Sequence, residues 1–445
     1  MSGSAAPRSP RVISIPAGAP FLETLVELLL RGTLFGRSDP LRPDELADAL
    51  LFLPTRRAAE VFASIIAARA PQGALMLPRI VLLGDPEPDS AAGSGLGGPA
   101  GLPGLPPAID PLVRQLKLFE LVDAWRRAIE TGTRPHGDGE PFFVARSRAD
   151  AFALAGDLAG LIDETIIEAV PLERLGQGMP PTFDPSRHDA YWSLTAKFLE
   201  IAAQQWPVIL AELGQSDAEH RTRSLLLEQA QRLAQSGTGR PVIVAGSTGS
   251  VSATAELMRC VAGLTMGAVV LPGLDTTLDA AAWDAIGAED AALATRFAHP
   301  QASMKRALAR IGIGRADVVL HGHSRIATRP QLASEVFRPA EASDAWSALR
   351  QDKVPEGMAL VEAADGGEEA LAIALILREA LETPGRTIAL ATPDRMLARA
   401  VQAELERWNV RVADSAGLRM IESPAGILAR LALLAARPDA GGTAL

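Results

Sequence analysis

Cysteine is almost absent from this chain of 445 residues, which contains only Cys260. A single thiol cannot form an internal disulfide, and it cannot build a multi-cysteine metal or iron–sulfur site. Cys260 falls among the apolar positions of a helical pattern, which favours a core residue over a nucleophile. The sequence therefore excludes internal disulfides and multi-cysteine metal or iron–sulfur sites within these residues.

Long apolar runs are also missing. The longest stretches that are mostly apolar, 25–30 and 427–436, each contain a charged residue and are far shorter than the roughly 20 residues that a membrane span requires. The N-terminal segment MSGSAAPRSPR has no apolar centre like that of a signal peptide. We therefore expect a cytoplasmic protein that does not contact membranes.

Lysine is scarce, since only four of the 43 Lys and Arg residues are lysine, and the net charge is −10. This charge argues against a protein that coats nucleic acid indiscriminately, although it allows a local basic groove. Arginine suits bidentate contacts with phosphate. The arginine bias accompanies high alanine and glycine, so we attribute most of it to overall composition.

A phosphate-binding P-loop is absent as well. Such a loop needs GxxxxGK[ST] after a strand, with amides and a lysine for phosphate and a hydroxyl for magnesium. After the apolar run 12–15 the chain instead reads Pro16, Ala17, Gly18, Ala19, Pro20, with one glycine, no lysine and two prolines that lack donor amides. We expect a degenerate P-loop here, without an intact ATPase site, and we assign no catalytic residue and no metal site.

The clearest motif that is present runs from Arg240 to Asp275. Apolar runs at 242–245 and 268–271 are typical of strands buried on both faces, and a helical pattern with Ser250 or Ser252 as its cap lies between them. This βαβ unit places its loops at the carboxyl ends of parallel strands, where open α/β sheets bind ligands.

The remaining pattern predicts two or three domains, because 445 residues are too many for one core. Further strands are expected at 11–15, 49–53, 316–320 and within 75–83, with helices at 21–31 and 56–68. Segment 86–107 is Gly- and Pro-rich and is predicted to be a mobile loop.

The region 110–235 is predicted to be helical, over 112–129, 149–168, 189–213 and 217–235. Its aromatic side chains are interpreted as core in preference to stacking platforms for single-stranded bases. They are Trp125, Phe152, Tyr191, Trp192, Phe198 and Trp206.

A second α/β unit is predicted towards the end of the sequence. Strands are expected at 359–363, 387–391 and 410–413, with helices at 368–381 and 394–408. With only three strands, this unit is expected to be incomplete.

Three groups of polar residues are candidate contacts. Thr55, Arg56 and Arg57 follow a strand at a helix N-terminus, which is a suitable grip for phosphate. The loop 246–250 offers the hydroxyls of Ser247, Thr248 and Ser250 to an anion, although a plain turn is the favoured reading. His321 and His323 lack a carboxylate or cysteine at ligand spacing, so a metal site there is not favoured.

Several segments together resemble a known family. VISIPAGAPFLETL, LLFLPTRRAAEVF, LPRIVLLGD, VIVAGSTGSVSATAELM, GAVVLPGLD, the His299–Arg306 segment and LETPGRTIALATPDRMLARAV occur in one order. This order resembles the N-terminal half of AddB, the double-strand-break repair subunit of the AddAB helicase–nuclease, in its alphaproteobacterial form. No single segment is a catalytic signature.

The resemblance implies a superfamily-1 helicase-like α/β fold with a RecA-like parallel sheet. Residues 1–108 and 236–345 would form the first helicase-like domain, 109–235 a helical insertion, and 356–445 the start of a second, truncated domain. It also implies an AddA motor subunit as partner and DNA ends and single-stranded DNA as ligands. The family's iron–sulfur cluster, magnesium and nuclease site would belong to a C-terminal region outside these residues, so no cofactor is expected here.

Two other classes of function remain open. One is an independent α/β enzyme that binds a nucleotide or a phosphorylated substrate at the loop 246–250. The other is a protein–protein adaptor without DNA contact.

Overall fold

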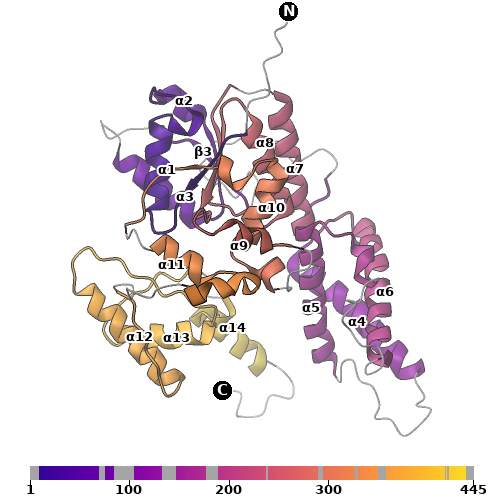
Figure 1. The fold of residues 1–445 in the computed structure, drawn as a ribbon. Helices are drawn as coiled ribbons and strands as arrows, with labels where there is room; N and C mark the ends of the chain where they lie inside the picture. The colour runs from indigo at the N-terminus through magenta and orange to yellow at the C-terminus, as the bar shows by residue number, and fades with distance from the viewer. Residues whose placement is uncertain are drawn as a thin grey trace, which may run out of the picture. The chain divides into compact units, whose positions relative to one another are not determined.

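A computed structural model shows an α/β fold built on a six-stranded, all-parallel sheet (Figure 1). The structure describes residues 10–69, 76–84, 105–132, 147–176, 189–236, 239–288, 294–325, 329–348, 357–415, 417 and 420–436. The strands are β1 (Val12–Ile15), β2 (Leu50–Leu53), β3 (Arg79–Leu82), β4 (Val242–Ala245), β5 (Gly267–Pro272) and β6 (Val319–Leu320). Their order across the sheet is β3-β2-β4-β5-β1-β6. The expected strands of the first part of the chain are thus confirmed, with shorter bounds for β3 and β6.

Both faces of the sheet are buried at β1, β2, β4 and β5, because alternate residues of these strands enter two separate apolar cores. Val244 and Leu271 face a core shared with α7 (Ala218–Ser236), α8 (Ser252–Gly263), α9 (Ala280–Ala285) and α10 (Ala302–Ile311). Ile243 and Val270 face the opposite core, formed with α1 (Phe21–Leu30), α2 (Pro43–Asp48) and α3 (Arg56–Ala68). This burial explains why these strands read as continuous apolar runs.

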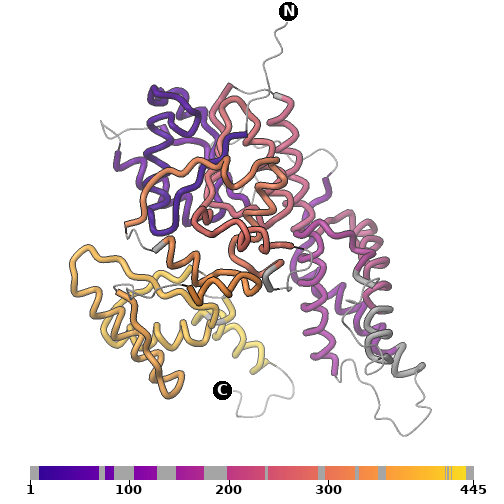
Figure 2. Tube along the Cα trace, in the orientation of Figure 1, coloured from indigo at the N-terminus to yellow at the C-terminus, as the bar shows by residue number. Residues whose placement is uncertain are grey.

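Four helices lie between β3 and β4 in the sequence (Figure 2). They are α4 (Pro111–Gly132), α5 (Arg148–Glu168), α6 (Asp189–Leu213) and α7, with a short 3₁₀ turn at Leu172–Gly176. The helical prediction for this region is confirmed. Most of the expected loop 86–107 lies outside the described residues.

The first three of these helices have their own apolar core, which contains Leu118, Ile162, Phe198 and Trp206. Phe198 and Trp206 are buried, and the ring of Trp125 stacks on Phe198 with centroids 4.3 Å apart. The core interpretation is confirmed for these rings, whereas Phe152 is 39 % exposed. The side chains of Tyr191 and Trp192 lie outside the described ones.

A buried ionic network connects the same helices. The guanidinium of Arg114 donates to both carboxylate oxygens of Asp163 at 2.9 and 2.8 Å, and its Nε lies 2.9 Å from Asp217. The indole Nε1 of Trp206 donates to the other oxygen of Asp217 at 3.0 Å. Because these residues come from α4, α5, α6 and the start of α7, the network fixes how the four helices pack.

The chain divides into two compact units, residues 1–352 and 353–445. The first also contains α11 (Arg329–Val336) and 3₁₀ or π turns at Thr33–Phe35, Ala294–Ala298, Arg315–Asp317 and Ala340–Ala348. The second contains α12 (Gly366–Leu381), α13 (Arg395–Glu406), α14 (Pro424–Ala435) and a turn at Met420–Glu422.

The strand predictions for the second unit are wrong in the described structure. Segments 359–363, 387–391 and 410–413 form no β-ladder, and Leu360 and Val361 are 87 % and 57 % exposed. The unit instead has a small helical core of Ala370, Ala374, Val401 and Leu405. An apolar β-branched composition makes a segment suitable for a sheet, but a strand also requires a hydrogen-bonded neighbour.

Candidate ligand site at the carboxyl edge of the sheet

The loop after β1, residues 16–20, is a tight turn that contacts another part of the protein. The amide of Ala19 donates to the carbonyl of Pro16 at 3.2 Å, and Gly18 has a φ of +81°. The amide of Arg325 donates to the carbonyl of Gly18 at 3.2 Å. The segment after β6 therefore packs against this loop, in the place where a P-loop would hold phosphate oxygens.

The loop after β4 has its own internal hydrogen bond. The amide of Gly249 donates to Oγ of Ser247 at 3.1 Å, and Gly246 and Gly249 have φ values of +78° and +70°. Thr248 is half-buried and Ser250 is exposed. This bond is typical of a serine turn, so Ser247 has a structural role whatever else it does.

The expected cap of α8 is wrong. The helix begins at Ser252, its N-cap residue is Val251, and no side chain caps it. Oγ of Ser252 donates instead to the carbonyl of Ile167 near the end of α5, at 3.1 Å. The serine that the pattern assigned to local capping connects two helices that are far apart in the sequence.

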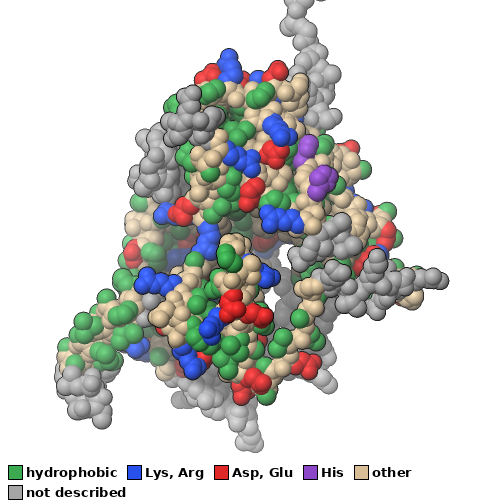
Figure 3. Space-filling model, turned by 90° about the vertical axis from the view of Figure 1, so that its left-hand side faces the viewer, with side chains coloured by type: hydrophobic (Ala, Val, Ile, Leu, Met, Phe, Trp, Pro, Cys, Tyr) green, Lys and Arg blue, Asp and Glu red, His purple; other side chains and the backbone are tan. Residues whose placement is uncertain are grey.

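Thr55 behaves as expected, because its Oγ1 accepts the amide of Ala58 at 3.2 Å and caps α3. Arg56 and Arg57 occupy the first turn of that helix and are exposed. A helix N-terminus with two cationic side chains attracts anions. On the face drawn in Figure 3, Lys and Arg side chains are interspersed with Asp and Glu rather than gathered in one stripe.

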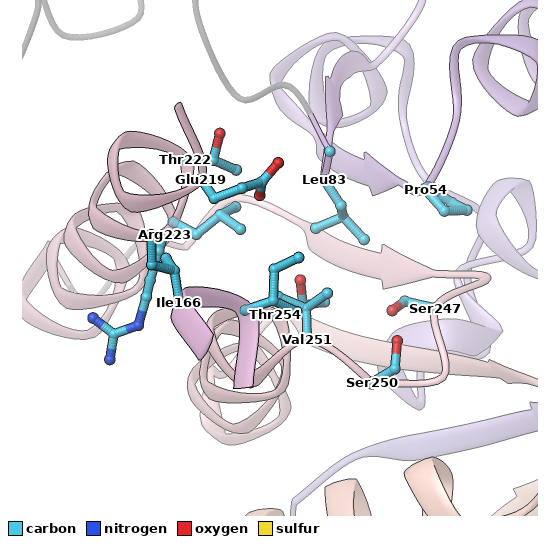
Figure 4. Close-up of a pocket in the computed structure, with 13 residues that line it drawn as sticks. Pro54, Leu83, Ile166, Glu219, Thr222, Arg223, Ser247, Ser250, Val251 and Thr254 are labelled. Atoms are coloured by element: carbon cyan, nitrogen blue, oxygen red, sulfur yellow. The ribbon is translucent and has the colours of Figure 1, made fainter. Parts of the chain in front are cut away.

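The edge pocket is a cavity of about 290 Å³ beyond the carboxyl ends of β2, β3 and β4 (Figure 4). Ser247 and Ser250 lie beside the strand ends, and Glu219 and Thr222 lie across from them on α7. The other lining residues are Pro54, Leu83, Gly84, Ile166, Ile167, Arg223, Leu226, Val251 and Thr254. The pocket thus forms where helices α5 and α7 meet the sheet.

Only part of the predicted set enters this pocket. Ser247 and Ser250 line it, whereas Thr248, Arg56 and Arg57 do not. Thr55 does not line it either, although the neighbouring Pro54 does. The arginine pair and the serine loop are therefore two separate candidate contacts.

The sequence analysis missed the residues that α7 contributes. Glu219, Thr222 and Arg223 belong to the run AEHRTR at the start of a helix, which reads as a solvated face. Nothing local distinguishes them from surface residues. Only the chain order could have pointed to them, because α7 leads directly into β4 and therefore passes the edge of the sheet.

Burial raises the pKa of Glu219, with a further rise from Asp163 that the Arg114 guanidinium partly offsets. The carboxyl of Glu219 therefore holds a proton more readily than an exposed glutamate. Together with the hydroxyls of Ser247, Ser250 and Thr222, it can hydrogen-bond a small polar group. Among the described residues, no side-chain base is hydrogen-bonded to these hydroxyls, so the geometry does not define a nucleophile–base pair.

Other reactive groups in the described part of the chain do not assemble into a second centre. Sγ of Cys260 lies 3.0 Å from the carbonyl of Ala230, and burial raises the pKa of this thiol, which disfavours the thiolate. The amide of His321 donates to the carbonyl of Ser14 at 3.0 Å. Within the described ranges, no group of three or more His, Cys, Asp and Glu residues is placed to hold a metal ion.

None of the described helices is both long and apolar enough to cross a membrane. A scan against protein-family models and a search of curated proteins found no match to this chain. What the structure defines is an α/β protein with a parallel sheet, a helical block between β3 and β4, and a pocket where the two meet.

Proposed function

We propose that this chain is a helicase-like subunit without a motor of its own, acting in a DNA double-strand-break repair helicase–nuclease. In this role the chain binds DNA and an AddA-type motor subunit in the cytoplasm while broken ends are resected for homologous recombination. The proposal rests on the order of segments that resembles AddB and on the parallel α/β sheet that carries the first of them. In this role the residues of this chain carry no nuclease site, magnesium or iron–sulfur cluster of their own.

The observation that carries the proposal is that the loop after β1 lacks the phosphate-binding groups of a motor and packs against another segment of the chain. In a helicase motor this loop holds the triphosphate with amides, a lysine and a hydroxyl. Here the loop has no lysine and contacts Ser324 and Arg325 of another segment. A parallel sheet whose phosphate-loop position packs against protein supports a scaffold role.

The helical block and the exposed arginines give this scaffold two means of contact. Helices α4, α5 and α6 have their own core, and α5 is held to α8 through Ser252, so these helices can act as a subdomain of the sheet domain. Arg56 and Arg57 provide cationic side chains at a helix N-terminus for a DNA phosphate. The net charge of −10 limits DNA binding to such local sites.

The test measures ATP hydrolysis and DNA binding by the purified chain, alone and with its AddA-type partner. We expect no ATP turnover by this chain alone, and binding to single-stranded DNA that strengthens with the partner. The matched partner carries a substituted P-loop lysine, so that any remaining hydrolysis belongs to this chain. Hydrolysis that persists with that partner, or by this chain alone, contradicts the proposal.

The edge pocket favours a second candidate, an independent α/β enzyme or binding protein for a nucleotide or phosphorylated compound. Its hydroxyls lie at the carboxyl edge of a parallel sheet, where such ligands bind. Thermal-shift measurements with nucleotides and sugar phosphates test it, with Ser247→Ala and Ser250→Ala as variants. A stabilisation that both variants abolish supports this second function, and the absence of any stabilisation rejects it. A protein–protein adaptor without DNA contact is the remaining alternative, and it predicts that the purified chain binds no DNA.

A further inference from the structure

A second cavity, the insertion pocket, lies among the helices between β3 and β4. Its volume is about 600 Å³, and it is bounded by the end of α5, the turn after it, α6 and the start of α7. Its walls are mostly apolar and include Ile162, Val170, Leu172 and Leu210. A largely apolar cavity of this size with a few polar groups is the usual form of a small-molecule site.

One of the charged residues that line this cavity is already paired. Asp217 lies 2.9 Å from Nε of Arg114 and accepts the indole N–H of Trp206 at 3.0 Å. Its carboxylate is therefore held inside the protein by two donors, one of which, Arg114, it shares with Asp163. The charge that remains comes from α7.

Arg223 is the unmatched charge. Its Nε is buried and has no hydrogen-bond partner among the described residues. Glu219 stands four positions earlier on α7, a spacing that permits an ion pair, yet the two side chains point apart (Figure 4). The guanidinium also points away from Ser247 and Ser250 of the edge pocket, and Arg223 lines the insertion pocket as well.

A buried donor without a partner is costly, and buried polar groups in proteins are nearly always satisfied. Nε itself is enclosed by protein, so a ligand in the cavity can reach only the terminal nitrogens of the guanidinium, to which no described residue supplies an acceptor either. A carboxylate matches the planar fork of a guanidinium and carries the single negative charge that one arginine balances. A dianionic phosphate would add a charge that no other cation lining the cavity opposes, because among the described lining residues His220 is the only other basic side chain.

We propose that the insertion pocket binds a small carboxylate with an apolar tail. The tail lies against Ile162, Val170 and Leu210, and the carboxylate pairs with Arg223. Apolar burial of the tail supplies most of the affinity, and the arginine selects the head group. This inference is independent of the DNA-repair proposal, because it rests only on the helical block.

The experiment measures binding of octanoate, decanoate and dodecanoate to the full chain by isothermal titration calorimetry, with decan-1-ol as an uncharged probe. We expect saturable 1:1 binding of at least one of the acids. Arg223→Gln weakens that binding at least tenfold and leaves decan-1-ol binding unchanged. Arg232→Gln, on the same helix but paired with Glu228 and 42 % exposed, is the control and keeps the original affinity.

A second variant, Leu210→Trp, fills the cavity and abolishes binding of both probes, which places them in this pocket. If Arg223→Gln fails to fold, Arg223→Lys keeps the charge without the planar fork and is expected to bind the acid more weakly than the original chain. Absence of saturable binding of any of the three acids by the original chain overturns the proposal. Equal affinity of the original chain and a folded Arg223→Gln variant for the acid also overturns it.

Discussion

Gly18 lies directly beneath the side chain of Ser324, so that a Cβ on Gly18 would stand 2.5 Å from Oγ of that serine. The contact joins the loop after β1 to the segment after β6, two neighbouring strands in the sheet. It is the most specific evidence that the loop is shaped for packing against protein.

Gly18→Ala should lower the free energy of unfolding by more than the strain of a left-handed backbone alone, which is about 1–2 kcal/mol. Gly214 is a matched control, because its φ is also positive, at +63°, but its Cβ would meet nothing within 4 Å. Urea denaturation of both variants separates strain from steric contact. Equal losses in the two variants would show that Ser324 moves aside without cost.

Arg56→Ala combined with Arg57→Ala should weaken binding to single-stranded DNA. Removal of two phosphate contacts is expected to reduce the slope of log affinity against log salt by about 1.4 for a single strand. The charge-matched control is Arg31→Ala with Arg259→Ala, two exposed arginines that pair with acids on their own helices. Fluorescence anisotropy at several salt concentrations measures both. Unchanged binding by the first pair favours the adaptor function.

Asp279 caps α9 through the amide of Ala282 and also pairs with Arg338. The amide and the guanidinium lower the pKa of this carboxyl below its usual value near 3.8. Because this pKa is lower in the folded state, the ionised carboxylate stabilises the protein at pH values above its usual pKa. This stabilisation is lost as the pH falls through the lowered pKa.

Asp279→Asn keeps a capping side chain and removes the charge, whereas Asp279→Ala removes both. At neutral pH we expect the order of stability to be original chain, Asn variant, Ala variant. The difference between the first two should disappear in acid, while the difference between Asn and Ala should persist. Thermal unfolding across this pH range checks both statements, and a charge effect that persists in acid would contradict the assignment.

Lys305 satisfies the end of α9 by donating to three backbone carbonyls, those of Trp283, Asp284 and Ile286, at 2.7, 3.0 and 2.7 Å. Lys305→Met should therefore destabilise the first unit by about 1.5–3 kcal/mol, as expected for the loss of a charged hydrogen-bond donor. Lys117→Met, which removes a surface pair with Glu120, should cost less than about 1 kcal/mol. Similar losses in chemical denaturation would show that water replaces the ammonium.

The strands of the sheet could be predicted because β4 and β5 are buried on both faces, and this burial requires apolar β-branched runs. The same signal failed at 359–363, because composition does not report whether a neighbouring strand pairs with the segment. The capping pattern failed at Ser252 for a related reason, since its hydroxyl bonds to a helix 85 positions earlier in the chain.

The two pockets could not be predicted from the spacing of residues in the sequence. Ser247 and Ser250 could be identified from their place after a strand, but Glu219 and Arg223 could not. These two side chains become significant only once α7 packs beside α8. Residues that come together from separate helices have no characteristic spacing in the sequence by which they could be recognised.

The first turn of α8 is hydrogen-bonded to two other helices. Oγ of Ser252 bonds to α5, and the carbonyl of the same residue accepts the guanidinium of Arg310 from α10 at 2.9 Å. A displacement of α5 along its axis must either break the first bond or pull that turn with it. Because Val251 and Thr254 line the edge pocket, a movement of that turn would also move part of the lining of the pocket.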